Sequence, residues 1–154
     1  MQISKSKLIE YLDSNLAKYE YLQFDSSCHS IEDASRATGE SADSFVKNVC
    51  FVDSNNNLIV AIVAGDKRAS SKRVAVALKI DRPTLATPEI ILQKSGFVIG
   101  GVPSFGYEAI FLVDDEVVNK EYVITGGGDE KSLIKIDTKT LLKLNRAKVC
   151  RVRK

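Results

Sequence analysis

The chain has 154 residues, of which 44% are hydrophobic and 27% charged, and its formal net charge is +2. These values are typical of a soluble globular protein and exclude a surface that is polycationic as a whole, so we expect residues 1–154 to form a single domain. The sequence contains neither the roughly 20 apolar residues that cross a bilayer nor the apolar centre of a signal peptide, so we expect a cytoplasmic protein without membrane contact.

The first half of the chain predicts two helices and three strands. These elements are a helix over residues 4–18, a strand over 19–24, a helix from 31 to about 38, and strands over 46–52 and 58–64. Ser30 and Gly39 are typical of the start and the end of the second helix. The turn 53–57 is rich in Asn, and it predicts that the two strands around it form a hairpin.

The second half mixes helices and strands irregularly. We expect helices near 71–78, 88–95 and 138–144, and strands near 109–113, 122–125, 133–136 and 147–152. Ser70 or Ser71, Thr87, and Asp137 or Thr138 are the expected N-caps of the three helices. This order predicts an α+β fold around a curved, mixed sheet, not a doubly wound nucleotide-binding fold.

A loop rich in glycine lies between two of the predicted segments. Its residues are Gly100, Gly101, Val102, Pro103, Ser104, Phe105 and Gly106. Glycine accepts positive φ and lets another molecule approach the main chain, while proline fixes φ. The loop is therefore a candidate binding site for a small polar ligand through exposed peptide groups, and a tight structural turn is the alternative.

Lys47 is a lone charge inside the apolar run 45–52. Lysine is rarely buried in a strand without a partner, so one interpretation places it on the solvent face or at the edge of the sheet. The functional interpretation is a cation at the floor of a pocket, directed at a carbonyl, hydroxyl or phosphate oxygen.

Two further clusters predict turns. Residues 126–128 are all glycine, but they lack the spacing of known phosphate-binding loops and indicate a flexible turn, from which Asp129 and Ser132 can reach a neighbouring pocket. The acidic run 114–116 lies in a turn, and we expect its carboxylates to be solvated.

Basic residues at 67–73 and 146–154 are expected to be solvated, with contact to an RNA backbone as the alternative.

The chain has few residues for nucleophilic or metal chemistry. Cys28, Cys50 and Cys150 form no Cys-x-x-Cys pair, and His29 is the only histidine, so we expect no disulfide framework and no metal site. His29 precedes the second helix with no nucleophile motif beside it, which favours a packing role. The first two cysteines are interpreted as buried thiols, and the sequence contains no recognisable catalytic triad.

These features together resemble the YbaK/ProX family, domains related to the editing insertion of bacterial prolyl-tRNA synthetases. The resemblance extends over roughly residues 20–153. Its segments, in order, are 29–34, 45–49 with the signature Lys47, 63–66 with the basic helix 71–78, 87–106, 124–127 and the helix 137–144. Many members read Gly-Gly-x-Ser-Pro in the loop, whereas here Pro103 precedes Ser104.

The resemblance implies a largely antiparallel, barrel-like sheet flanked by helices, and hydrolysis in trans of mischarged aminoacyl-tRNA that carries a small amino acid such as alanine or cysteine on proline tRNA. It implies that Lys47 is catalytic, bonding the substrate near its scissile ester or terminal phosphate. The resemblance implies that the loop holds the aminoacyl group together with His29, Asp129 and Ser132. It also implies that water or the ribose hydroxyl attacks the ester. It implies no cofactor, and it implies tRNA and an aminoacyl-tRNA synthetase as partners.

Two other functions remain open at this point. A module of the same fold without catalysis would bind tRNA ends or a synthetase, and Lys47 would then be a phosphate contact alone. A hydrolase of free esters would act without tRNA, although no activated nucleophile is visible in the sequence.

Overall fold

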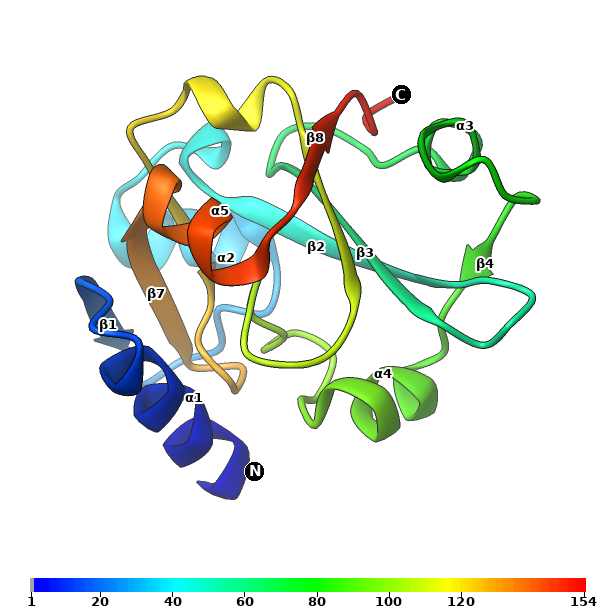
Figure 1. The fold of residues 1–154 in the computed structure, drawn as a ribbon. Coiled ribbons are helices and arrows are strands. Elements are labelled where there is room, and N and C mark those ends of the chain that lie inside the picture. The colour runs from blue at the N-terminus through cyan, green and yellow to red at the C-terminus, as the bar shows by residue number, and fades with distance from the viewer. Residues whose placement is uncertain (1) are drawn as a thin grey trace.

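The computed structural model describes residues 2–154 (Figure 1). Helices and strands are mixed irregularly along the chain as an α+β fold, which confirms the predicted class. The elements in order are α1 (Gln2–Ser14), β1 (Tyr19–Gln23), α2 (Ile31–Thr38), the 3-10 helix η1 (Ala42–Ser44), β2 (Val46–Val52), β3 (Leu58–Ala64), α3 (Ser71–Leu78), β4 (Thr84–Leu85), α4 (Pro88–Ser95), β5 (Ile110–Asp114), the 3-10 helix η2 (Val117–Asn119), β6 (Tyr122–Gly126), β7 (Ser132–Asp137), α5 (Thr138–Asn145) and β8 (Lys148–Cys150).

Local capping explains why most helices begin and end where the sequence predicts. The side chains at the four N-caps accept a hydrogen bond from the backbone N–H three residues later, which satisfies one of the free donors of the first turn. These caps are Ser30, Ser70, Thr87 and Asp137. Gly39 and Gly96 end α2 and α4 in the left-handed conformation. α1 ends at Ser14, earlier than residue 18, and β4 was not predicted.

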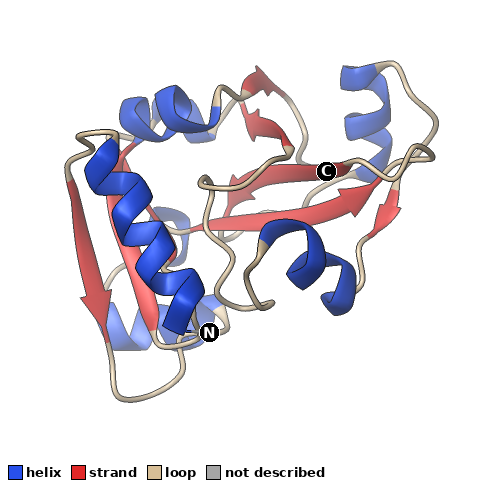
Figure 2. Ribbon diagram, turned by 60° about the horizontal axis from the view of Figure 1, so that its bottom comes forward, coloured by secondary structure: helices blue, strands red, loops and turns tan. Residues whose placement is uncertain are grey.

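Two sheets form the centre of the molecule. Strands β4-β2-β3-β5-β8 make one sheet, and β1-β7-β6 make the other. Pairing is antiparallel except for β3–β5 and β5–β8, so the sheets are largely antiparallel as predicted. A parallel bridge between Phe45 and Ile124 joins them, and they do not close into a barrel. The helices lie around the sheets (Figure 2). None of the helices in residues 2–154 is long and apolar enough to cross a membrane.

The hairpin β2–β3 lies between two hydrophobic clusters. Every residue of β3 is buried. In β2, Val46 and Cys50 pack in one cluster while Phe51 packs in the other, because successive side chains of a strand point to opposite faces. On the side away from β3, β2 pairs with β4 at Phe51 and Val52. The rest of this edge borders the cavity described below.

Asp114 corrects the expectation that the acidic turn is solvated. Its side chain is 1% exposed and accepts hydrogen bonds from the backbone N–H groups of Val152 and Arg153. The Arg153 guanidinium also binds it at 3.0 Å and contacts Asp115 and Glu116, which stay exposed. The expectation is wrong for Asp114 because the C-terminal segment, 38 residues later in the chain, covers its carboxylate.

Candidate functional site

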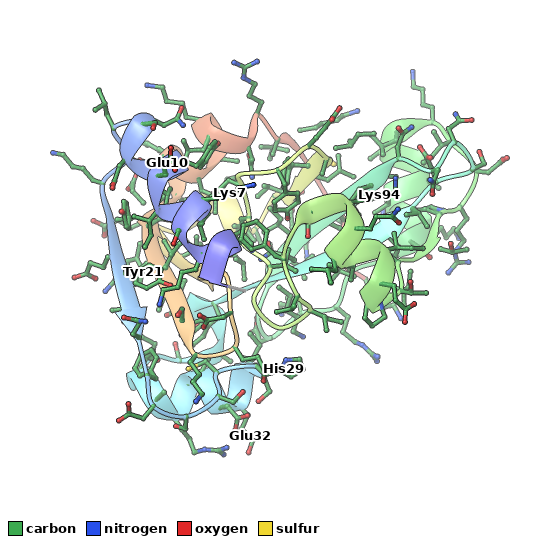
Figure 3. All side chains as sticks on the ribbon, turned by 90° about the horizontal axis from the view of Figure 1, so that it is seen from below. Lys7, Glu10, Tyr21, His29, Glu32 and Lys94 are labelled. Carbon is green, nitrogen blue, oxygen red and sulfur yellow. The ribbon has the colours of Figure 1, made fainter. Side chains whose placement is uncertain are left out.

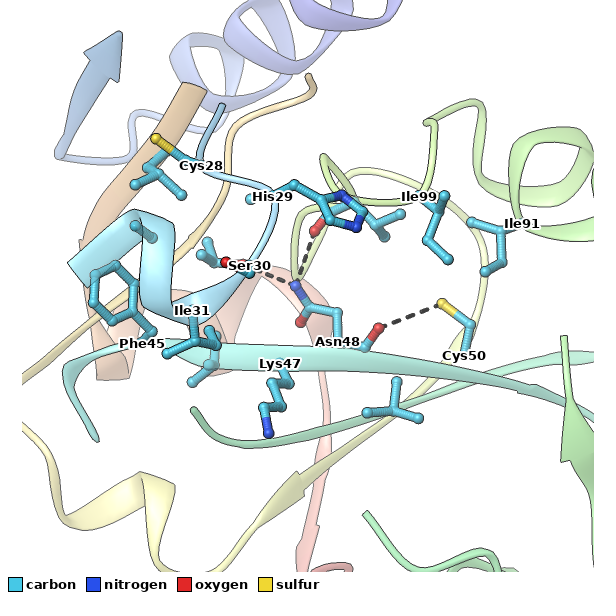
Figure 4. Close-up of a pocket in the computed structure, with 18 of the residues that line it drawn as sticks. Cys28, His29, Ser30, Ile31, Phe45, Lys47, Asn48, Cys50, Ile91 and Ile99 are labelled. Carbon is cyan, nitrogen blue, oxygen red and sulfur yellow. Dashed lines mark hydrogen bonds between the residues drawn. The ribbon is translucent and has the colours of Figure 1, made fainter. Parts of the chain in front are cut away.

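A cavity of about 480 Å³ opens beside β2. This volume is within the range of small-molecule sites, which runs from about 300 to 1,000 Å³. Its walls come from the start of α2, the edge of β2, β4 and α4, the loop after α4, and the ends of β6 and β7 (Figure 4). Apolar side chains predominate, namely Ile31, Ala34, Phe45, Val46, Val49, Cys50, Leu85, Ala86, Ile91, Ile99, Val102, Ile124 and Leu133.

Three polar side chains form a closed ring of hydrogen bonds beside this cavity. The Ser104 hydroxyl donates to Asn48 Oδ1 at 2.6 Å, and Asn48 Nδ2 donates to Thr125 Oγ1 at 3.0 Å. Ser104 has a single hydroxyl proton, so the 2.8 Å contact between Ser104 Oγ and Thr125 Oγ1 must use the Thr125 proton. Asn48 Nδ2 gives its second proton to the carbonyl of Val102. These hydrogen bonds hold the loop against β2 and β6. Because both hydroxyl protons are used within the ring, neither hydroxyl can donate to a ligand.

The two glycine clusters of the sequence lie against each other. A methyl group on Gly126 would lie 2.3 Å from the carbonyl oxygen of Val102, and one on Gly101 would lie 2.6 Å from the backbone nitrogen of Asp129. The backbone N–H of Gly128 donates to the carbonyl of Gly101 at 2.8 Å. Close approach of two main chains therefore requires glycine here, and the run 126–128 is a packed part of the site instead of the flexible turn that the sequence indicated.

The glycine-rich loop is largely buried, in contrast to the expected exposed peptide groups. Gly101, Val102, Pro103, Ser104 and Phe105 are all buried. Phe105 is fully buried and stacks on Tyr11, and the carbonyl of Pro103 accepts a hydrogen bond from Tyr107. Of the seven predicted loop residues, Gly100 and Val102 line the cavity. Gly106 lies at the other end of the loop against Leu8.

Lys47 lines the cavity, but its amine points away from the loop. Figure 4 shows its side chain on the side of β2 opposite to Asn48 and His29. The amine donates to the carbonyl of Lys67 at 2.8 Å, just beyond the end of β3. The polar group of β2 that reaches the loop is therefore the amide of Asn48, one residue later.

The remaining predicted residues lie in different surroundings. His29 lines the cavity and lies at the surface (Figure 3). Its ring packs on Gly100, so a methyl group added to Gly100 would lie 2.1 Å from Nδ1 of His29. Asp129 and Ser132 are absent from the walls of the cavity. Asp129 accepts a hydrogen bond from the backbone of Lys131, and the hydroxyl of Ser132 is buried without a hydrogen-bond partner.

Comparison with known proteins identifies the family. Residues 25–144 match the family model of the aminoacyl-tRNA editing domain. The chain belongs to this family. It is 24% identical over 129 residues, 82% of each chain, to the uncharacterized protein YwhH of Bacillus subtilis (strain 168). The predicted resemblance to YbaK-type editing domains is confirmed.

Solved structures share the fold of this editing domain. A crystal structure described as that of a candidate trans-editing enzyme for prolyl-tRNA synthetase superposes with a TM-score of 0.89 at 23% sequence identity, covering 98% of this chain and 97% of the other. The crystal structure of the hypothetical protein APE2540 also gives a TM-score of 0.89, at 21% identity over 96% and 99% of the two chains. The editing-domain fold therefore extends over nearly the whole chain.

The two thiols that line the cavity, those of Cys28 and Cys50, have raised pKa values, which disfavours nucleophilic attack. Burial raises the pKa of Cys50 to about 11, so its thiol is protonated near neutral pH. Burial also raises the pKa of Cys28, and the charges of Asp33 and Asp129 raise it further. Within residues 2–154, no group of three or more His, Cys, Asp and Glu side chains is arranged to hold a metal ion.

Sequence reasoning missed two polar residues of the editing-domain cavity, Asn48 and Thr125. Asn48 was a second polar residue inside the apolar run of β2, next to Lys47, and this doublet was the available signal. Two adjacent polar residues in a strand must point to opposite faces, so only one of them can face the loop. Thr125 ends an apolar strand directly before the glycine run, which gave no comparable signal.

Proposed function

We propose that this editing domain hydrolyses, in trans, the ester of mischarged tRNA that carries a small non-cognate amino acid, such as alanine or cysteine on proline tRNA. Family membership and the apolar cavity of about 480 Å³ support the proposal. The likeness to a protein described as a candidate trans-editing enzyme for prolyl-tRNA synthetase points to the same class of substrate. The cavity is the observation that carries it.

An apolar cavity of fixed size suits the removal of a wrong small amino acid. A synthetase site cannot strongly reject a smaller side chain, because a missing methylene is worth only about 1–3 kcal/mol. A second pocket that admits the smaller side chain and excludes the larger one supplies the remaining discrimination. The aliphatic walls at Ile31, Ile91 and Ile99 would set that limit.

The proposed reaction uses groups of the substrate more than groups of the protein. Water attacks the ester carbonyl, either directly or after the neighbouring ribose hydroxyl has attacked and taken over the acyl group, and only the attack by water releases the amino acid. The bond from the carbonyl carbon to the ribose oxygen then breaks, and a proton passes to that oxygen. Both cavity-side cysteines have raised pKa values, and the hydroxyl protons of Ser104 and Thr125 are engaged in the ring. These facts support attack by water or by the ribose hydroxyl over a covalent enzyme intermediate.

We assign Lys47 to the terminal phosphate of the tRNA in preference to the ester. Its amine lies on the side of β2 opposite to the loop and uses one of its three N–H donors on the Lys67 carbonyl. The other two donors are suited to a phosphate at the rim of the cavity. His29 and Gly100 would border the aminoacyl group, whereas Asp129 and Ser132 would act only through the backbone that supports the loop.

The deciding experiment is a deacylation assay on alanyl-, cysteinyl- and seryl-tRNA with the parent protein and two variants. Ala86→Phe adds a ring to a partly exposed wall of the cavity, and it should lower kcat/KM by more than a hundredfold. Ala37→Phe makes the same change on the exposed surface of α2 and should leave the rate within twofold. Lys47→Ala should raise KM about tenfold with little change in kcat, because a single phosphate contact is lost.

The competing function is binding of tRNA ends or of a synthetase without catalysis. A parent protein that binds tRNA but leaves all three esters intact would establish that alternative and contradict deacylation. Hydrolysis of a short aminoacyl ester as fast as that of the tRNA would instead indicate a hydrolase of free esters.

A further inference from the structure

Two segments far apart in the sequence lie side by side on one side of the fold. They are residues 67–82, which include α3, and residues 148–154, which include β8 (Figure 1). The backbone N–H of Ser70 donates to the carbonyl of Val152 at 2.8 Å, and that of Lys154 donates to the carbonyl of Arg68 at 2.9 Å. The amine of Lys148 donates to the carbonyl of Ala77 in α3 at 2.7 Å.

These two segments concentrate positive charge. They hold ten of the 22 Lys and Arg residues but only one of the 20 Asp and Glu residues, which gives a formal charge of +9. The rest of the chain has 12 basic and 19 acidic residues, a formal charge of −7. The small net charge of the protein therefore conceals a strong asymmetry. We call the exposed members the basic surface: Lys67, Arg68, Lys72, Arg73, Lys79, Arg82, Lys148, Arg151 and Lys154.

The tenth cation marks the border of the basic surface. Arg153 is bound by Asp114, Asp115 and Glu116 on the neighbouring end of β5, so its charge is neutralised within the protein. Asp81 is the acidic residue within the two segments. The nine cations of the basic surface are exposed, so their charges can serve a partner in solution.

The composition of the basic surface selects the kind of partner. Residues 67–82 and 148–154 contain no Phe, Tyr or Trp, so they offer no platform for stacking unpaired bases. Their exposed large apolar side chains are Val76 and Val149, too few for the apolar face with which a helix enters a lipid surface. Cations without aromatics are suited to the phosphates of a double-helical nucleic acid, which are contacted without regard to sequence.

Lys47 connects the cavity with the basic surface. Lys47 lines the cavity, and its amine donates to the carbonyl of Lys67, the first residue of the basic surface. A polyanion that follows the basic surface toward Lys67 therefore arrives at the rim of the cavity.

We propose that the basic surface binds the phosphodiester backbone of the double-helical acceptor arm of the tRNA whose 3′ end enters the cavity. This inference rests on the proposed function, because it takes the cavity as the place of the aminoacyl ester. The tRNA body then crosses α3 and the C-terminal segment, and the unpaired 3′ end passes Lys47 as it enters the cavity.

The test measures binding of an RNA hairpin that copies a tRNA acceptor stem with its unpaired 3′ end. The double variant Lys72→Glu with Arg73→Glu places acidic residues in the first turn of α3, where the helix dipole favours them, so the fold is retained. Lys139→Glu with Lys143→Glu makes the same change of charge on α5, a helix of equal length, at two exposed residues. Fluorescence anisotropy is followed over a series of salt concentrations.

We expect the α3 variant to bind the hairpin at least tenfold more weakly, and to lower the slope of log affinity against log salt by about two. The α5 variant should change affinity by less than twofold. Arg151→Glu with Lys154→Glu, from the other segment, should reproduce the loss. Equal effects of the α3 and α5 changes would overturn the proposal. It would also be overturned if the parent protein bound the unpaired 3′ end alone more tightly than the hairpin, or if it bound vesicles containing phosphatidylserine more tightly than the hairpin.

Deacylation assays separate this proposal from the proposed function. If the parent hydrolyses no aminoacyl-tRNA yet loses hairpin binding only in the α3 and C-terminal variants, catalysis is contradicted and the basic surface is retained. If the parent hydrolyses aminoacyl-tRNA and the α3 variant does so at the parental rate under subsaturating conditions, the basic surface is contradicted and catalysis is retained.

Discussion

The side-chain amide of Asn48 donates a hydrogen bond to the main-chain carbonyl of Val102 at 2.9 Å, which joins β2 to a loop 54 residues later in the chain. The same amide belongs to the ring with Ser104 and Thr125, of which the last two are buried. The wall of the cavity that contains Gly100 and Val102 is therefore held in place by side chains. Asn48 thus has a structural role where β2 faces the loop, whereas the resemblance implied a catalytic role for its neighbour Lys47.

We predict that Asn48→Ala destabilises the protein more than Thr125→Val. The first change removes three hydrogen bonds, those of Asn48 to Ser104, Thr125 and the Val102 carbonyl, and the second removes two, at a cost of about 1 kcal/mol for each bond lost. Urea unfolding should therefore show that the free energy of unfolding falls by about 3 kcal/mol in Asn48→Ala and by about 2 kcal/mol in Thr125→Val. Asn119→Ala, at an exposed residue, should stay within about 0.5 kcal/mol. Comparable small losses in all three variants would show that the ring is dispensable.

A second prediction concerns the contact between the two glycine clusters. Gly126→Ala should cost about 3 kcal/mol in unfolding free energy, because its methyl group would lie 2.3 Å from the backbone oxygen of Val102. Gly39→Ala is the matched control, since Gly39 has φ +77° but nothing within 4 Å of the added methyl. It should cost only about 1 kcal/mol, the penalty of the left-handed conformation. If the two costs were equal, backbone conformation and not close approach would be the reason for glycine at 126.

Local signals in the sequence predicted most of the fold, because they act over a few residues. The caps at Ser30 and Thr87 and the glycines that end α2 and α4 need no knowledge of the tertiary structure. The hairpin 46–64 is equally local, since the Asn-rich turn fixes its pairing. The two-residue strand β4 escaped prediction because it has no pattern of its own and depends on the edge of β2.

The site was harder to predict because its geometry depends on contacts between distant segments. Both faces of β2 are covered by hydrophobic clusters, so the apolar pattern could not show whether Lys47 or Asn48 faced the loop. Likewise, nothing near Asp114 indicated that a tail 38 residues later would bury it. The run 126–128 has the composition of a flexible turn, and the sequence gives no sign that this segment packs against the main chain at Gly101.

Asp114 should make stability depend on pH in the acid range. Burial by itself would raise the pKa of this carboxyl, but hydrogen bonds from the backbone of Val152, Glu116 and Arg153 and from the Arg153 guanidinium lower the pKa overall. A pKa lower in the folded than in the unfolded protein stabilises the fold above the unfolded value of about 3.9, and this stability is lost as pH falls through the folded pKa. Asp114→Asn should cost about 2 kcal/mol at pH 7, and the difference from the parent should shrink below about pH 4.

Thermal unfolding from pH 7 to pH 2 measures this effect. Asp115→Asn is the control, because its carboxylate is 51% exposed and its contact with the same guanidinium should be worth less than about 1 kcal/mol. A difference between parent and Asp114→Asn that stayed constant down to pH 2 would show that the carboxylate does not titrate with folding.

The last prediction tests whether a thiol takes part in the reaction. Burial raises the pKa of Cys50 to about 11 and also raises that of Cys150, which is only partly buried. Iodoacetamide at pH 7.5 should therefore label Cys150 first, and it should label Cys28 and Cys50 only after unfolding, as mapped by mass spectrometry of tryptic peptides. Cys50→Ala, which shortens one wall of the cavity, should keep kcat for deacylation within about tenfold. Rapid labelling of Cys50 in the folded protein, together with a loss of kcat above a thousandfold in Cys50→Ala, would make this thiol the nucleophile and would contradict attack by water or by the ribose hydroxyl.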